Sequence, residues 1–180
     1  MKLTAPFLAA AFAALTAASA QAAIPRLPDM SGDEASALAV YAVPSLLAAV
    51  RQTCAGELSP NGFLARQGDY LAQRYAAEQN AAWPLARSAM FKFASTKAGD
   101  KLKAFTTLPD QTIRPLADAL IQQEAAAKIH PHSCHSIQRM AEALSPLEPR
   151  DAGRILGVMF DIATESEKIA SLIGDKPARP

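Results

Sequence analysis

The stretch SGDEASALAVYAVPSLLAAVRQTC, residues 31–54, carries the clearest helix signals in the chain. Ser31 and Glu34 have the spacing of a capping box, in which each side chain binds the backbone amide of the other residue. We therefore expect a first helix over about residues 33–43. Because Pro44 lacks an amide hydrogen, we expect the helix to kink there or a second helix to start. Beyond the proline, apolar residues recur at helical spacing: Leu46, Leu47, Val50 and Cys54.

Five further segments show helical periodicity, bounded by proline, serine or glycine. We expect them over about 59–78, from Pro84 toward Gly99, over about 109–130, 133–145 and 149–173. Pro115 falls early enough in its segment to be tolerated with some distortion. The last segment has a broad apolar stripe: Ile155, Leu156, Met159, Phe160, Ile162 and Ile169. No alternating run of strand length is bounded by turn residues, so we predict an all-α fold. The domain, residues 33–174, would be an irregular bundle of six or seven helices around one core.

Residues 1–22 have the three parts of a secretory signal peptide. Lys2 supplies the positive charge, residues 3–18 are apolar, and small residues at Ala20 and Ala22 offer two cleavage points. The apolar run is too short for a membrane span, which needs about 20 such residues. We therefore expect a periplasmic or secreted protein with no membrane span after cleavage. Residues 23–32 should form an extended leader, and residues 175–180 a disordered tail.

The charge of the chain argues against nucleic acid as a partner. Cleavage after residue 22 of the 180-residue chain would leave 158 residues, the size of one domain. The whole chain has 18 Lys and Arg against 17 Asp and Glu, and Lys2 lies in the signal. The mature chain would be neutral overall, whereas duplex binding relies on clustered positive charge.

Cys54 and Cys134 each lie on the apolar stripe of an expected helix, so both side chains should point into the core. In an oxidising compartment, such a pair favours a disulfide, and the alternative is two unpaired core cysteines. The chain contains neither a C-x-x-C pair for redox exchange nor a C-x-x-C-H haem motif. The predicted bridge is therefore structural.

All three histidines fall in the segment 130–135: His130, His132 and His135. Imidazole is a ligand that copper and zinc favour, so this segment is a candidate metal site. The alternative is that the histidines lie on an exposed joint between two helices, with His130 near the negative end of a helix dipole. His135 follows Cys134 directly, so we expect it at the rim of the core.

A basic region follows Pro84 and opposes an acidic region over residues 142–167. Its positive residues are Arg87, Lys92, Lys97, Lys101 and Lys103. They are candidates for contact with an anionic surface. The alternatives are a solvated helix face and attraction between the two charged regions within the molecule.

No G-x-S-x-G, S-x-x-K or H-E-x-x-H motif occurs in the mature chain. We therefore expect a non-catalytic helical protein without a cofactor that binds an envelope protein or a small ligand. Two alternatives remain open. One is a periplasmic copper or zinc protein that uses the histidines. The other is an envelope hydrolase or lyase with scattered carboxylates, such as Asp161 and Glu165 on one helix face.

Overall fold

The structure is a computed structural model that describes the backbone of residues 29–98 and 107–174 and the side chains of residues 29–95 and 107–166. This part of the chain contains five α-helices and no β-strand, which confirms the all-α prediction. The helices are α1 (Gly32–Thr53), α2 (Phe63–Ala98), α4 (Asp110–Lys128), α5 (Cys134–Leu144) and α6 (Pro149–Gly174), with a 3₁₀ turn at Pro131–Ser133. The predicted signal peptide, residues 23–28 of the predicted leader, and the predicted tail lie outside the described residues.

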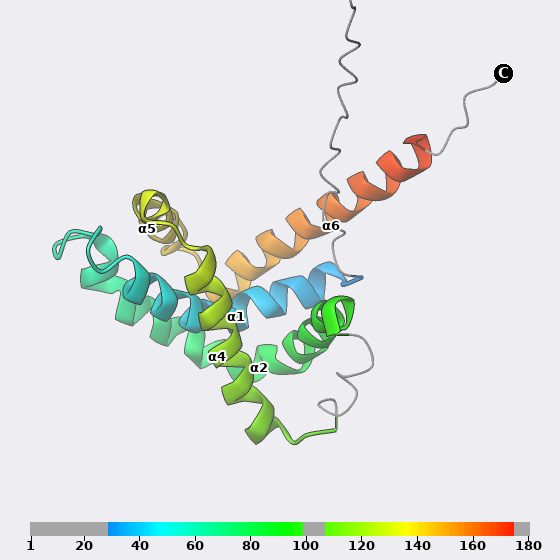
Figure 1. Ribbon diagram of the computed structural model, residues 1–180, viewed down its shortest axis with the longest axis horizontal. Coiled ribbons are helices and arrows are strands. Elements are labelled where there is room, and N and C mark those ends of the chain that lie inside the picture. Colours follow the sequence, from blue (N-terminus) through cyan, green and yellow to red (C-terminus); the bar gives the residue numbers. More distant parts are fainter. Residues whose placement is uncertain (1–28, 99–106, 175–180) are drawn as a thin grey trace, which may run out of the picture.

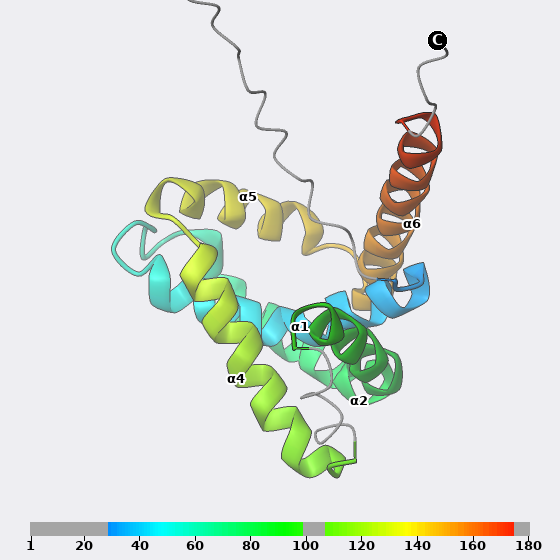
Figure 2. The ribbon, with the colours of Figure 1, turned by 45° about the vertical axis from the view of Figure 1, so that its right-hand side comes forward.

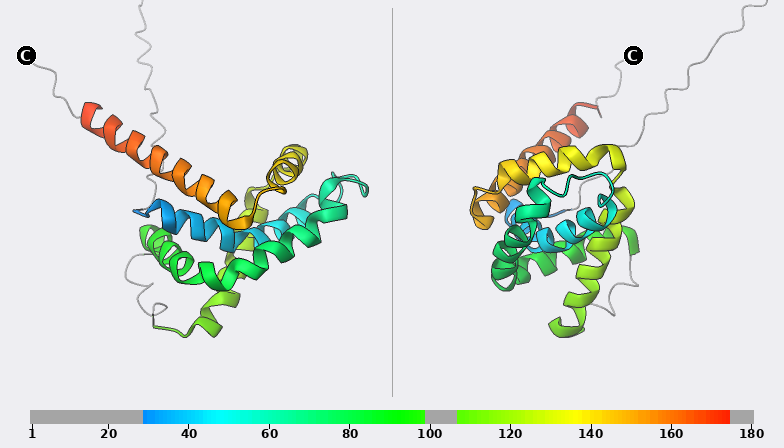
Figure 3. Two further views of the ribbon diagram at one scale, coloured as in Figure 1. Left: turned by 180° about the vertical axis from the view of Figure 1, so that it is seen from behind. Right: turned by 90° about the vertical axis from the view of Figure 1, so that its left-hand side faces the viewer.

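The described helices are fewer than the six or seven expected, because two prolines lie inside helices instead of separating them. Pro44 lies within α1 and Pro84 within α2. A proline removes one intrahelical hydrogen bond, and neighbouring contacts offset the loss. The carbonyl that Pro44 leaves without its helical donor is that of Val40, and the next carbonyl, that of Tyr41, accepts from Gln79 Nε2 of α2 at 2.9 Å. Pro84 is exposed, and α2 changes direction along its length (Figure 3).

The capping box at the start of α1 forms as predicted. The Ser31 amide donates to Glu34 at 2.9 Å, and the Glu34 amide donates to the Ser31 hydroxyl at 3.2 Å. The expected serine and proline start of the next helix is wrong. Ser59 and Pro60 belong to a turn, in which the Gly62 amide donates to the Ser59 carbonyl at 2.8 Å, and α2 begins only at Phe63.

Helix α1 is the centre of the fold, and α2, α4 and α6 all pack against it. It lies between α6 and α2, and α4 crosses it (Figures 1 and 2). The C-terminal half of α6 extends away from the other helices in every view. Within the described residues, α1 alone is long and apolar enough to span a membrane, with a mean hydropathy of 1.3. Its central packing position is that of a core helix.

Two groups of buried side chains form the core, one at each side of α1. The larger group joins α1, α2, α5 and the start of α6: Val40, Leu47, Val50, Cys54, Phe63, Leu64, Leu71, Tyr75, Cys134 and Ala152. The smaller group joins α1, α2 and α4: Ala37, Tyr41, Trp83, Ala86 and Ile113. In the smaller group, burial and the neighbouring Asp118 raise the pKa of Tyr41.

Arg74 of α2 holds the connection between α5 and α6. Its guanidinium donates to the carbonyls of Ser145 at 2.6 Å and Leu147 at 3.0 Å, and it lies 3.3 Å from the Glu148 carboxylate. The first bond satisfies the carbonyl of Ser145, the C-cap of α5, which has no intrahelical partner. The turn that starts α6 is therefore fixed to α2.

Candidate binding surface on α6

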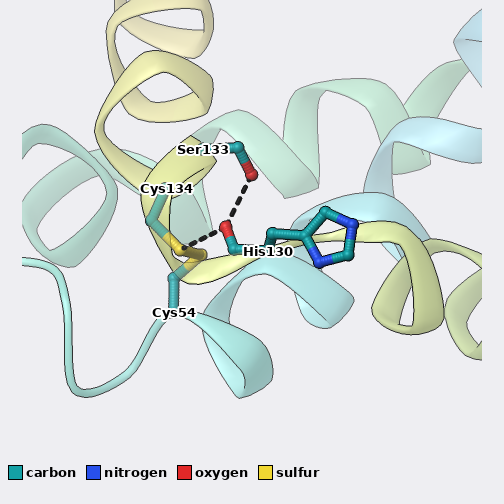
Figure 4. Close-up of a disulfide and its surroundings, with 4 residues drawn as sticks. All are labelled: Cys54, His130, Ser133 and Cys134. Atoms are coloured by element: carbon teal, nitrogen blue, oxygen red, sulfur yellow. Dashed lines mark hydrogen bonds between the residues drawn. A yellow bond between two sulfur atoms is a disulfide. The ribbon is translucent and has the colours of Figure 1, made fainter. Parts of the chain in front are cut away.

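The predicted disulfide is present and joins the end of α1 to the start of α5. Cys54 and Cys134 have a Cα–Cα distance of 5.7 Å, and both side chains are fully buried. Figure 4 shows the surroundings of this bridge, where the Ser133 hydroxyl donates to the His130 carbonyl at 2.7 Å. The Cys134 sulfur lies 3.8 Å from the same oxygen, a contact without a hydrogen because the sulfur is bonded to Cys54. A disulfide of this kind fits an oxidising compartment.

The histidines lie on the exposed joint between α4 and α5. The His130 and His132 rings stack with centroids 5.5 Å apart and planes 11° apart. His135 is exposed, not at the rim of the core as expected, because it points away from the Cys134 side of α5. Over residues 29–95 and 107–166, no group of three or more His, Cys, Asp or Glu side chains is arranged to hold a metal ion. Of the three candidate metal ligands, the fold thus brings His130 and His132 together.

The two described members of the basic region have acidic partners within the molecule. Arg87 lies 3.4 Å from Asp110, and its guanidinium lies over the Phe91 ring at 5.0 Å. The Lys92 ammonium lies 2.8 Å from Glu34. The side chain of Lys97 and all of Lys101 and Lys103 are outside the described residues. Contact of this region with an anionic surface stays a prediction.

Glu34 connects the start of α1 to α2. Its carboxylate accepts from the Ser88 hydroxyl at 2.6 Å and the Lys92 ammonium at 2.8 Å. The hydrogen bond from Lys92 and, to a lesser extent, the one from Ser88 lower the pKa of Glu34 to about 2. The side chain is only 9% exposed, so the charge is stabilised by its partners more than by water.

Helix α6 packs on the core with its small residues. The buried residues of its described part are Pro149, Ala152, Gly153 and Gly157. A Cβ added at Gly153 would lie 2.6 Å from Val40 Cγ2 and 3.0 Å from the Ser36 carbonyl oxygen, and one at Gly157 would overlap the Gly32 carbonyl. Only glycine allows two helix backbones to approach this closely.

Asp161 lies where α6 crosses the N-terminus of α1. Its carboxylate lies directly over Gly32, the first residue of α1. The amide groups at the start of a helix carry a partial positive charge, so a carboxylate is stabilised there. Asp161 and Glu165 are both exposed.

Five large apolar side chains in the described part of α6 face solvent, whereas Phe160 is half-buried. Ile155, Val158, Met159 and Ile162 are between 47% and 60% exposed, and Leu156 is 43% exposed. We call the first four residues the outward stripe. An apolar stripe on a surface helix usually faces the core. Here the glycines take that position, so the stripe predicted from the sequence lies on the opposite side.

An open groove of about 460 Å³ lies beside the outward stripe, between α1, α2 and α6. Its apolar residues are Ala37, Val40, Ala81, Ala82, Leu85 and Val158. Charged residues at its rim are Asp33, Glu78, Arg150, Arg154 and Asp161, and Arg150 lies 2.8 Å from Glu78. Val158 belongs to both surfaces, which makes them continuous.

The sequence-based reasoning did not identify this groove. Gly153 and Gly157, four residues apart, were the available signal, because that spacing puts two glycines on one helix face and indicates a close crossing. The groove residues come from three helices far apart in the sequence. No family model, curated protein or solved structure matches the chain.

Proposed function

We propose that the protein is an exported, non-catalytic helical module that binds another envelope component, either a protein or a small apolar ligand. Cleavage of the signal after Ala20 or Ala22 and residence in the periplasm or outside the cell are part of this proposal. Its support in the fold is the buried Cys54–Cys134 disulfide, which persists in oxidising compartments.

The observation that carries the proposal is the groove between α1, α2 and α6. Its volume of about 460 Å³ falls within the range of small-molecule sites, roughly 300–1,000 Å³. Leu85 and Val158 flank it and are 47% and 53% exposed. An apolar ligand or the side chain of a partner would remove both from water and gain the corresponding hydrophobic free energy. The charged rim supplies polar contacts that orient what binds.

Site-specific photo-crosslinking in growing cells tests this proposal. A photoreactive phenylalanine replaces Leu85 in the groove or, as a control of similar exposure, Leu116 on α4. We expect a discrete adduct from position 85 and none from position 116. Native mass spectrometry of the protein isolated from the envelope would reveal a small ligand as an added mass that Leu85→Glu removes. Absence of both the adduct and the added mass would contradict a binding function for the groove.

Export is tested separately by the intact mass of protein from the cell envelope. We expect a chain cut after Ala20 or Ala22 and two hydrogens lighter than its reduced form. A full-length mass, or two free thiols before reduction, would contradict export with a native disulfide.

A further inference from the structure

The outward stripe of α6 has the spacing of a helix-pairing surface. Ile155, Val158, Met159 and Ile162 follow one another at intervals of three, one and three residues, so they form one ridge along the helix. All four remain about half exposed or more in the described structure. Helix α6 is 26 residues long, or about 39 Å at 1.5 Å per residue, and its C-terminal half stands clear of the other helices (Figure 2).

Charges of opposite sign follow each other along one side of this stripe. Arg150 and Arg154 precede the centre of the stripe, and Asp161 and Glu165 follow it. At 3.6 residues per turn, steps of four and seven residues return to nearly the same side of a helix. All four residues therefore flank the stripe on one side, with positive charge in the first half and negative charge in the second.

We propose that two copies of the protein associate through α6, paired antiparallel about a two-fold axis between Val158 and Met159. Ile155 of one copy then lies opposite Ile162 of the second copy. Arg154, which lies 3.4 Å from Asp151 of its own chain, comes beside Asp161 of the second copy. Arg150, which lies 2.8 Å from Glu78 of its own chain, comes near Glu165 of the second copy. The two-fold axis repeats each pair, so one surface is complementary to itself, as a closed symmetric dimer requires.

The charge order selects this arrangement over the alternatives. In a parallel pair, the two-fold axis would put the charged sides of the two helices at opposite edges of the interface, where no arginine of one copy meets a carboxylate of the other. Antiparallel packing also aligns the two helix dipoles favourably.

An anionic membrane is a poorer match, because Asp151, Asp161 and Glu165 border the stripe and outnumber its two arginines. One helix pair is a small interface, so the dimer should dissociate on dilution.

Cysteine crosslinking tests both the contact and its direction. The native cysteines are already joined, so a single added cysteine reports only on contacts between copies. Under mild oxidation of the mature protein, we expect Met159→Cys, close to the axis, to form a covalent dimer. Ser166→Cys, on the same side of α6, should not crosslink to itself. Position 151 lies opposite position 166 in the antiparallel pair. A mixture of the Ser166→Cys and Asp151→Cys variants should therefore form a covalent heterodimer. Efficient self-crosslinking of Ser166→Cys alone would overturn the antiparallel arrangement.

Sedimentation across a concentration series gives the second measurement. We expect Ile162→Glu to raise the dimer dissociation constant at least about tenfold, since it puts a charge into the interface. Leu116→Glu, at a position of similar exposure on α4, should leave the constant unchanged. Circular dichroism checks that both variants keep the fold.

A wild-type protein that stays monomeric at all concentrations overturns the proposal. The proposal is also overturned if the protein floats with phosphatidylglycerol vesicles and Ile162→Glu abolishes this flotation without changing the sedimentation mass of the protein in solution. That result would assign the stripe to a membrane. None of the substituted residues lines the groove, so these variants test the pairing of α6 separately from binding in the groove.

Discussion

Helices α1 and α6 both carry many large apolar side chains, yet they use them in opposite ways. In α1, Val40, Tyr41, Leu47 and Val50 are less than 9% exposed, because α2, α4 and α6 surround the helix. In the described part of α6, Ala152, Gly153 and Gly157 are buried, whereas the outward stripe faces solvent. The difference shows that an apolar stripe identifies a surface that needs a partner, and that the partner need not be the protein's own core.

The disulfide stabilises the core around α1, and its removal should have the largest effect. Cys54 and Cys134 close a segment with a sequence separation of 80. The chain-entropy model gives about 4 to 5 kcal/mol for such a loop. We expect Cys54→Ser with Cys134→Ser to lower the free energy of unfolding in urea by about that amount. A loss of less than about 1 kcal/mol would show that the bridge adds little to the noncovalent core.

Truncating one large side chain in each helix tests the comparison directly. Leu47→Ala in α1 should cost about 3 kcal/mol, because it leaves a cavity in the larger core group. Ile155→Ala in α6 should change stability by no more than about 0.5 kcal/mol, as at other exposed positions. Urea unfolding should be measured below the concentration at which dimers form. Equal losses would contradict the outward placement of the stripe.

An added methyl group tests the close approach of α6 to α1. Gly157→Ala should cost about 2 kcal/mol, because its Cβ meets the Gly32 backbone and one helix must shift. The matched control is Gly56→Ala, where a Cβ has no neighbour within 4 Å. Thermal unfolding of both variants gives the difference. A neutral effect of Gly157→Ala would mean that the two helices separate easily.

Acid should weaken the contact between the start of α1 and α2, and we expect the loss in the free energy of unfolding to be smaller than in the preceding variants. The pKa of Glu34 is about 2 when folded, below its ordinary value of 4.5, so its contribution is complete above pH 4.5 and is lost as the pH falls toward 2. Lys92 is 45% exposed and screened by solvent, so we expect Glu34→Gln to cost only about 1 kcal/mol at pH 7. The variant should also lose less stability than wild type between pH 4.5 and 2. Parallel pH profiles in urea unfolding would contradict this role.

Local signals in the sequence were sufficient for the capping box and for the disulfide. The Ser31 and Glu34 pair depends on residues three apart, and each cysteine lies on the apolar stripe of its own segment. The prolines were harder to interpret. Pro44 lies within α1, which packs against α2, α4 and α6, and these contacts come from residues far away in the sequence, such as Gln79, 35 positions on, which donates to the Tyr41 carbonyl.

The surface on α6 could be predicted only in part. Its apolar periodicity is plain in the sequence, but the direction that the stripe faces is set by Gly153 and Gly157 against Gly32 and Val40. That contact joins residues more than 100 positions apart. The groove depends on the same packing, so residue patterns alone do not reveal it.

The position of the disulfide also determines how the chain responds to a protease. The bond links residues 54 and 134, so α2 and α4 lie inside a covalent ring, whereas α6 lies outside it. A single cut within the ring leaves one covalently connected molecule, whose two fragments separate on a gel only after reduction. A cut between α5 and α6 releases the C-terminal fragment with the bridge intact. Gels run with and without reductant would thus show which part of the molecule a protease reaches first.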